Sequence, residues 1–445
     1  MGRTPDRDGC ALGETINSQP SMSAHAQHHA LSVARERVTL LTLGAVQFTH
    51  ILDFMIMMPL GAQLMRVFNI TPSQFTYLVA SYGIAAALSG FAGGFVLDRF
   101  DRKRSLIFLY TGFGLATLAC AMAPTHGALL VARLAAGAFG GLAGSMVTAM
   151  VGDIIPPTRR GRAMGIVMAS FPLASVLGVP LGLYTAAKFS WHAPFFLLAA
   201  CAAVVLPIAA LALPPIKTAV HDHQPLRQMR EILSHGVHLR AFAVGMVLVM
   251  AGGSLIPFLA PSFVSNLGLD PAVGLPTTYM VGGIATAVST PFIGWLSDRM
   301  DRLKLLTIMS GGAIVVVLII TRLGHTSVPV ASLMMALFMV TMSGRFTPAM
   351  TMITNAVDAR YRGGFMSVNA ALQQAASAGA CVLAGQFITA APGGRLVGMP
   401  ALGYVSVTFF VLTVLLATEL RAIAPHVSKP ADRPRIAPAP TKAAA

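Results

Sequence analysis

The sequence has little charge and lacks the motifs that mark common enzymes. Only 11% of its 445 residues are Asp, Glu, Lys or Arg, whereas soluble domains average about 25%. It contains no Gly-x-Ser-x-Gly, His-Glu-x-x-His or phosphate-loop pattern. The shortage of charge indicates a chain solvated by lipid. The missing motifs argue against an enzyme, and we expect neither a cofactor nor a metal site.

Cysteine is also scarce, with four residues in the whole chain. Cys120, Cys201 and Cys381 fall in apolar runs and Cys10 in the polar N-terminal segment. A disulfide framework needs paired cysteines in an oxidising compartment, so none is expected here.

What the sequence does contain is long apolar runs. Hydrophobic residues make up 55% of the chain, and the mean hydropathy is +0.71. A helix needs about 20 apolar residues to cross the hydrocarbon core, and the runs lack the alternation of membrane barrel strands. We therefore predict an all-α membrane protein with twelve transmembrane helices. The runs are Val38–Met65, Phe75–Leu97, Ser105–Ala123, Ala128–Met150, Ala163–Ala187, Ala193–Leu213, Ala241–Leu267, Leu275–Ser297, Leu305–Thr321, Val328–Asn355, Gly363–Ala390 and Ala401–Leu420.

The basic residues are distributed unevenly between the loops. With both termini in the cytoplasm, 25 of the 31 Lys and Arg residues lie on the inner side, four on the outer side and two within spans. This is the positive-inside pattern. The formal net charge of +15 therefore sets the topology, and we expect no nucleic-acid partner.

The chain repeats itself at an offset of about 200 residues. "GGFVLDRFDRKRSL" (Gly93–Leu106) follows the second run, and "FIGWLSDRMDRLKLL" (Phe292–Leu306) follows the eighth. A second match aligns "RRGRAMGIV" (Arg159–Val167) with "YRGGFMSV" (Tyr361–Val368). Two such matches predict two six-helix halves in parallel orientation, an arrangement used by transporters that rock about a central site.

The predicted organisation follows from this repeat. Residues 1–34 lack the apolar core of a signal peptide, and their composition is typical of a disordered tail. The expected units are the cytosolic tail 1–34, the N-terminal six-helix bundle 35–213, the cytosolic linker 214–238, the C-terminal bundle 239–421 and the disordered tail 422–445.

The loop after the second run resembles the hallmark loop of the major facilitator superfamily. That pattern is Gly-x-x-x-Asp-Arg-x-Gly-Arg-Arg/Lys, and both copies here carry Asp (Asp101 and Asp301) in place of the second Gly. The resemblance implies the major facilitator fold and alternating-access transport of a small-molecule substrate. It also implies a monomer in the lipid bilayer of a bacterial inner (plasma) membrane.

In that family, contacts of this loop lock an inner gate. Asp98 could meet the start of the eleventh helix near Gly363, where a helix dipole favours a carboxylate, and Arg102 could reach Asp153. The alternative is that these charges only enforce topology. The candidate gate residues are Gly94, Asp98, Arg99, Arg102, Asp153, Asp298 and Arg302.

Two further stretches resemble the drug–proton antiporter branch and arabinose-type efflux permeases. "LLVARLAAGAFGGLAG" (Leu129–Gly144) carries an intramembrane Arg followed by small residues. "FPLASVLGVPLGLY" (Phe171–Tyr184) resembles the antiporter motif of the fifth helix, with Gly178, Pro180 and Gly182 as its key residues. The resemblance implies proton-coupled efflux of amphiphilic compounds. Transport of sugars or organic anions, as a uniporter or with protons, is the alternative.

The stretch "THILDFMIMMPLGAQL" places Asp53 within the first apolar run. Charge at the bilayer centre costs at least about 2.5–3.5 kcal/mol, so a carboxyl there calls for a function. Asp53 lies about 15 residues, or roughly 22 Å, into the run, at the depth expected of Arg133. We predict that Asp53, Arg133 and His50 couple transport to protons. A fixed ion pair is the alternative for Asp53 and Arg133, and a packing role for His50.

Other intramembrane polar groups are candidates for the substrate cavity. Arg345 in "VTMSGRFTPAM" has no mid-membrane acid in its half of the chain, which favours contact with an anionic or carbonyl group of a substrate. Asn369 and Gln373 share a helix face, although bonding between helices would also explain them. The predicted cavity set is Gln47, Met57, Arg345, Asn369 and Gln373.

Overall fold

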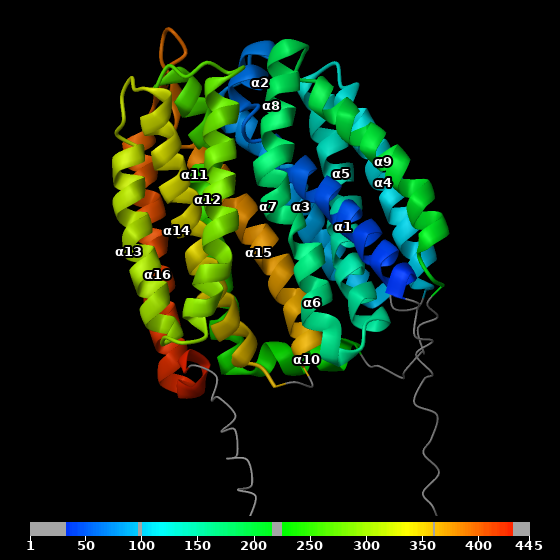
Figure 1. The fold of residues 1–445 in the computed structure, drawn as a ribbon. Helices are drawn as coiled ribbons and strands as arrows, with labels where there is room; N and C mark the ends of the chain where they lie inside the picture. Colours follow the sequence, from blue (N-terminus) through cyan, green and yellow to red (C-terminus); the bar gives the residue numbers. More distant parts are fainter. Residues whose placement is uncertain (1–32, 97–99, 216–224, 359–360, 430–445) are drawn as a thin grey trace, which may run out of the picture.

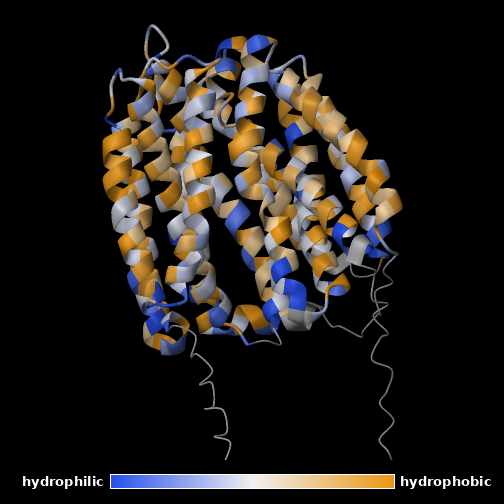
Figure 2. Ribbon diagram, in the orientation of Figure 1, coloured by the Kyte–Doolittle hydropathy of each residue, from blue (hydrophilic) through white to orange (hydrophobic). Residues whose placement is uncertain are grey.

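The protein is a bundle of long, roughly parallel helices (Figure 1). The computed structural model describes residues 33–96, 100–215, 225–358 and 361–429. The described chain begins and ends at the same end of the bundle, at the bottom of Figure 1. We call this end the terminal face and the other end the opposite face. Hydrophilic residues gather at both faces and apolar residues cover the helices between them, as Figure 2 shows.

The N-terminal half contains six membrane crossings. The fifth crossing is divided into α6, α7, η2 and α8, and α2 is a short helix at the opposite face (Figure 1). The elements are α1 (Val33–Ile56), α2 (Gly61–Val67), α3 (Pro72–Val96), α4 (Arg102–Ala121), α5 (His126–Ile154), α6 (Pro157–Met168), α7 (Ser170–Leu173), η2 (Ala174–Gly178), α8 (Val179–Lys188) and α9 (Ala193–Ala212).

The C-terminal half repeats the plan after a short amphipathic linker helix. A two-stranded antiparallel hairpin pairs Thr389 with Val397 at the opposite face. The elements are α10 (Pro225–Ser234), α11 (Gly236–Ser265), α12 (Gly274–Ser297), α13 (Arg302–Ile320), α14 (Val328–Asn355), α15 (Arg362–Gly385), β1 (Thr389–Ala390), β2 (Leu396–Val397), α16 (Met399–Ile423) and η3 (Pro425–Ser428).

Eleven helical segments of the described chain are long and apolar enough to cross a membrane. The remaining crossing is α15, whose composition is more polar because it carries Asn369, Gln373 and Gln374. It packs against α3 of the other half and α11 of its own. A helix shielded by protein on two sides can afford polar side chains that lipid would not tolerate.

The first crossing differs from its prediction. The apolar run continues to Met65, but α1 ends at Ile56 and a turn precedes α2. Pro59 lies in that turn and has no N–H to continue a helical ladder. Gly61 begins α2 at a crowded point, where a Cβ would lie 2.6 Å from the Phe75 ring. The break places Asp53 in the last turn of α1 rather than in the middle of a longer helix.

The ends of the two halves also differ from the expected boundaries. Helix α11 begins at Gly236, inside the segment expected to be linker, and α10 gives that linker a helix of its own. The C-terminal tail was expected to be disordered from residue 422, yet η3 follows α16 with Val427 and Ser428 fully buried. The expected N-terminal tail lies almost wholly outside the described residues.

The apolar core shows how the two halves meet. Toward the opposite face, one continuous cluster of buried side chains includes residues of both halves, such as Leu78 and Phe258. Toward the terminal face the core is divided, with one cluster built only from the N-terminal half and another only from the C-terminal half. The halves are therefore packed together at the opposite face and separately at the terminal face.

Specific contacts agree with this division. Near the opposite face, Ser73 Oγ donates to Gly385 O at 2.7 Å, and the Phe75 and Phe258 rings meet edge to face at 6.3 Å. The structure is closed at the opposite face and looser at the terminal face.

Candidate functional site

The predicted partners Asp53 and Arg133 meet in a buried ion pair. Arg133 Nη1 lies 2.7 Å from Asp53 Oδ2, and both side chains are 0% exposed. The same Nη1 also lies 3.3 Å from the Asp53 backbone oxygen. The pair joins α1 to α5 inside the N-terminal half. Desolvating two charges is costly, and close hydrogen-bonded geometry is what offsets that cost.

Tyr82 of α3 completes the site, and the sequence analysis missed it. The Arg133 guanidinium carbon lies 4.6 Å from the centre of the Tyr82 ring, within the range of a cation–π contact. The Tyr82 hydroxyl lies 3.0 Å from His50 Nδ1. A tyrosine in the middle of an apolar span needs a hydrogen-bond partner, and this requirement was the available signal.

The small residues after Arg133 make room for this network. A Cβ on Gly137 would overlap the Tyr82 backbone, and one on Gly140 would lie 2.5 Å from the Tyr82 hydroxyl. A Cβ on Gly144 would lie 2.6 Å from His50 Nε2. Ordinary contacts to a Cβ are longer than 3.4 Å, so the glycines allow α5 to approach α3 and the His50 ring closely.

The fifth crossing supports the helix that carries Asp53. A Cβ on Gly178 would lie 2.7 Å from Leu52, and one on Gly182 would lie 2.5 Å from Ile56. Residues 174–178 form a π-helical turn, η2. Pro180 lies just beyond it and lacks an N–H, which explains why the α-helical ladder is interrupted there. The motif thus packs against the residues on either side of Asp53.

The same π-helical turn contacts the other half. A Cβ on Gly283 of α12 would lie 2.9 Å from the backbone of Ser175 and Val176. Because η2 touches α1 on one side and α12 on the other, it lies between the Asp53 helix and the C-terminal half.

Four of the five predicted cavity residues are buried in this conformation, and the fifth, Gln373, is half-buried. Gln47 is 9% exposed and Met57 is fully buried. Asn369 and Gln373 pack on α11, since a Cβ on Gly245 would lie 2.7 Å from Asn369 Oδ1 and 2.9 Å from Gln373 Nε2. Their contact with a substrate stays a prediction. Asn369 Oδ1 accepts no hydrogen bond from the described residues, and Gln373 Nε2 lies 3.5 Å from Met350 Sδ of α14.

Arg345 lies inside the C-terminal half and has no carboxylate partner among the described residues. Its Nη2 donates to Leu248 O of α11 at 2.6 Å, and its guanidinium carbon lies 4.4 Å from the centre of the Phe410 ring of α16. It is 2% exposed. The structure therefore places Arg345 apart from the Asp53–Arg133 pair, and its contact with a substrate also stays a prediction.

The first copy of the repeated loop has the expected contact at the terminal face. Arg102 Nε lies 3.1 Å from Asp153 Oδ2, joining the start of α4 to the end of α5. Of the other candidate gate residues in this copy, Asp98 and Arg99 lie outside the described residues, and Gly94 is in the last turns of α3.

The second copy makes different contacts from the first. Arg302 Nη1 donates to Val427 O at 3.4 Å and to Lys429 O, both in its own half. It is 5% exposed, and it holds the chain that follows α16. Asp298 lies at the C-terminal end of α12. The assignment of Arg302 to an inner gate stays a prediction; in this conformation its Nη1 binds backbone carbonyls of its own half.

The departure from the family pattern in both copies has a physical reason. Asp101 Oδ1 accepts from the Arg104 backbone N–H at 2.9 Å, and Asp301 Oδ1 accepts from that of Lys304 at 3.0 Å. Each Asp is therefore the N-cap of the following helix, α4 or α13. An N-cap Asp satisfies an otherwise unpaired helix N–H, which glycine could not do.

Comparison with known proteins shows which family has this architecture. Residues 43–381 match the family model of the Major Facilitator Superfamily. The chain is 30% identical over 192 residues to the uncharacterized MFS-type transporter YceJ of Bacillus subtilis, covering 43% of this chain and 49% of that protein. It is 31% identical over 140 residues to multidrug resistance protein 3 of the same organism, covering 32% and 26%.

The fold is also that of solved transporters. A crystal structure of a D-xylose–proton symporter superimposes with a TM-score of 0.71 and 18% identity, covering 87% of this chain and 97% of that chain. The alignments with the two Bacillus proteins span about half and about a quarter of those relatives' lengths. The family-model match covers more than half of the chain, and its helices form the two six-helix repeats of that fold. The chain therefore belongs to the major facilitator superfamily of membrane transporters.

Proposed function

We propose that the protein exports small amphiphilic compounds in exchange for protons, and that Asp53 carries the proton. The observation that supports this most is the fully buried Asp53–Arg133 pair. Among the described residues, Asp53 is the only carboxylate that is buried. Intramembrane ionisable groups are rare because they are costly, and they commonly mark ion or substrate pathways.

Protonation of Asp53 would change the packing of the N-terminal half. A neutral Asp53 leaves Arg133 as a buried charge without an ionic partner, and such a loss is strongly destabilising. The N-terminal half then lowers its free energy by rearranging so that Arg133 reaches water or another acceptor. In this scheme His50 and Tyr82 connect the pair to the partly exposed side of α1.

The π-helical turn η2 offers a route from this change to the other half. It packs against the Asp53 helix through Gly178 and Leu52, and against α12 through Ser175 and Gly283. A shift of α1 would press on η2 and so on the contact between the halves. Transport by rocking of two halves requires a link of this kind.

The conformation suits loading from the terminal face, where the core is divided. The excess of basic residues in the loops of that face supports a cytoplasmic location for it, in the plasma membrane of a bacterial cell. A substrate would then enter from the cytoplasm and leave at the opposite face. The name of multidrug resistance protein 3 is consistent with an efflux role.

The test is efflux from proteoliposomes under an imposed pH gradient, with substrates first found by screening in a drug-sensitive host. Asp53→Asn should lose gradient-driven transport while still exchanging labelled for unlabelled substrate. Asp358→Asn is the matched control, since Asp358 is an exposed carboxyl at the terminal face. Undiminished gradient-driven efflux by Asp53→Asn would refute the role of Asp53.

A second candidate is transport of sugars or organic anions, either as a uniporter or with protons. Arg345 favours it, as a buried cation without a carboxylate partner in the described chain, and a D-xylose–proton symporter shares the fold. Substrate counterflow that does not respond to pH and that is abolished by Arg345→Gln would favour the uniporter of this second candidate.

A further inference from the structure

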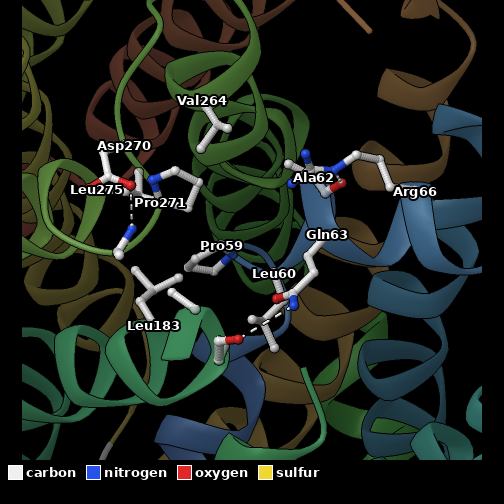
Figure 3. Close-up of a pocket in the computed structure, with 13 residues that line it drawn as sticks. Pro59, Leu60, Ala62, Gln63, Arg66, Leu183, Val264, Asp270, Pro271 and Leu275 are labelled. Atoms are coloured by element: carbon white, nitrogen blue, oxygen red, sulfur yellow. Dashed lines mark hydrogen bonds between the residues drawn. The ribbon is translucent and has the colours of Figure 1, made fainter. Parts of the chain in front are cut away.

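A pocket opens between the two halves at the opposite face (Figure 3). Its volume is about 260 Å³. The N-terminal half supplies the start of α2 and the end of α8, and the C-terminal half supplies the end of α11, the following loop and the start of α12. The apolar walls are Pro59, Leu60, Leu183, Val264, Pro271 and Leu275.

Two opposite charges line the pocket, one from each half. Arg66 projects from α2, and Asp270 lies on the other side of the pocket in the α11–α12 loop (Figure 3). They are not paired with each other: Arg66 Nε donates to Ala62 O at 3.1 Å, and Asp270 Oδ1 accepts from the Ala272 N–H at 3.1 Å. Both residues are exposed, and these local bonds leave the Arg66 Nη groups and Asp270 Oδ2 open to a ligand.

The size and chemistry of the pocket restrict the ligand. Pockets for drug-sized molecules run from about 300 to 1,000 Å³, so this one suits something smaller. A guanidinium prefers a carboxylate and a carboxylate prefers an ammonium group, while the walls between them are apolar. We propose that the pocket binds an apolar amino acid or a zwitterion of similar size, with its carboxylate toward Arg66 and its ammonium group toward Asp270.

Binding there would hold the opposite face closed. Because the walls come from both halves, the pocket exists only while α2 and α8 lie against α11 and α12, and a ligand bound only in this state stabilises it. At nine times its dissociation constant, such a ligand shifts the conformational ratio about tenfold. The site would thus let a solute on that side slow turnover without being transported. The pocket is distinct from the Asp53–Arg133 pair, because neither Asp53 nor Arg133 lines it.

The experiment measures thermal unfolding of the full chain in lipid nanodiscs. The probes are L-phenylalanine, its amide, which has only the ammonium group, and N-acetylphenylalanine, which has only the carboxylate. L-phenylalanine should raise the Tm saturably and bind at least about tenfold more tightly than either derivative, the loss expected for one charge-assisted contact. Absence of a saturable shift with L-phenylalanine would overturn the proposal.

Variants test each contact separately. Arg66→Gln should bind L-phenylalanine and its amide equally, and Asp270→Asn should bind L-phenylalanine and the N-acetyl compound equally. Arg322→Gln is the matched control, because Arg322 is an exposed arginine just after α13 that donates to Leu318 O of that helix but does not line the pocket. Unchanged selectivity in both pocket variants would refute the assignment of the two charges.

Two further variants keep the result interpretable. Ala62→Phe fills the pocket from α2 and should abolish the shift even if the charge variants prove unstable; a retained shift would mean that the ligand binds elsewhere. Asp53→Asn should keep a saturable shift with the same preference for L-phenylalanine over its two derivatives, because Asp53 does not line the pocket. If Asp53→Asn keeps gradient-driven efflux while L-phenylalanine still binds the pocket, only the proposed function fails. If Asp53→Asn loses that efflux but neither the wild type nor any variant shows a saturable shift, only the pocket proposal fails.

Discussion

The Asp53–Arg133 pair allows a quantitative test by a double-mutant cycle. At a separation of 2.7 Å and an effective dielectric constant of about 20, the attraction between two unit charges is roughly 6 kcal/mol. The cost of desolvating the two charges opposes most of this attraction, so the net contribution of the pair to the free energy of unfolding is much smaller. Removing one partner of a buried pair, however, costs about 3–5 kcal/mol, because the other charge stays behind.

We therefore expect Asp53→Asn and Arg133→Gln each to lower the free energy of unfolding by about 3–5 kcal/mol. The double variant should recover most of that loss, since two neutral amides can hydrogen-bond. The assay is denaturant-induced unfolding of purified protein in mixed micelles, with transport measured in parallel. Additive losses, with the double variant the least stable, would show that the two residues do not act as a pair.

Three further predictions follow from the packing. Gly144→Ala places a Cβ 2.6 Å from the His50 ring and should lower stability by about 1–3 kcal/mol in thermal unfolding; Gly127→Ala, where a Cβ meets open space, should not. Arg302→Gln should expose the C-terminal segment to carboxypeptidase faster than in the wild type; an equal rate would refute its anchoring role. A cysteine introduced at Gly294, which faces open space, should react with a soluble maleimide added from the terminal face, and protection there would contradict the divided core.

Much of the candidate site could be read from the sequence because a membrane penalises charge. Asp53 and Arg133 stand out in apolar runs whatever their neighbours are, and counting residues from the span ends places them at similar depths. The duplicated loop similarly predicts two halves. These are properties of position along one chain and of the lipid solvent, and they do not depend on how each helix is rotated.

Contacts between side chains of different helices could not be predicted from position along the chain. Tyr82 joins the site because α5 approaches α3 closely at Gly137 and Gly140, and the rotation of each helix decides which side chains meet. Arg102 and Arg302 occupy equivalent positions in the repeat, yet one binds a carboxylate and the other binds carbonyls of η3. The local sequence is similar in both places, and only the surrounding chain differs.

The sequence by itself determined the membrane solvent, the number of crossings, the duplication and the two intramembrane charges, because each follows from hydropathy and spacing along the chain. The tertiary structure alone decided that α1 breaks before Pro59, that Arg302 binds η3, and that the halves share a core only toward the opposite face. Those features depend on the packing of helices far apart in sequence, where the shape of one surface selects the partner of another.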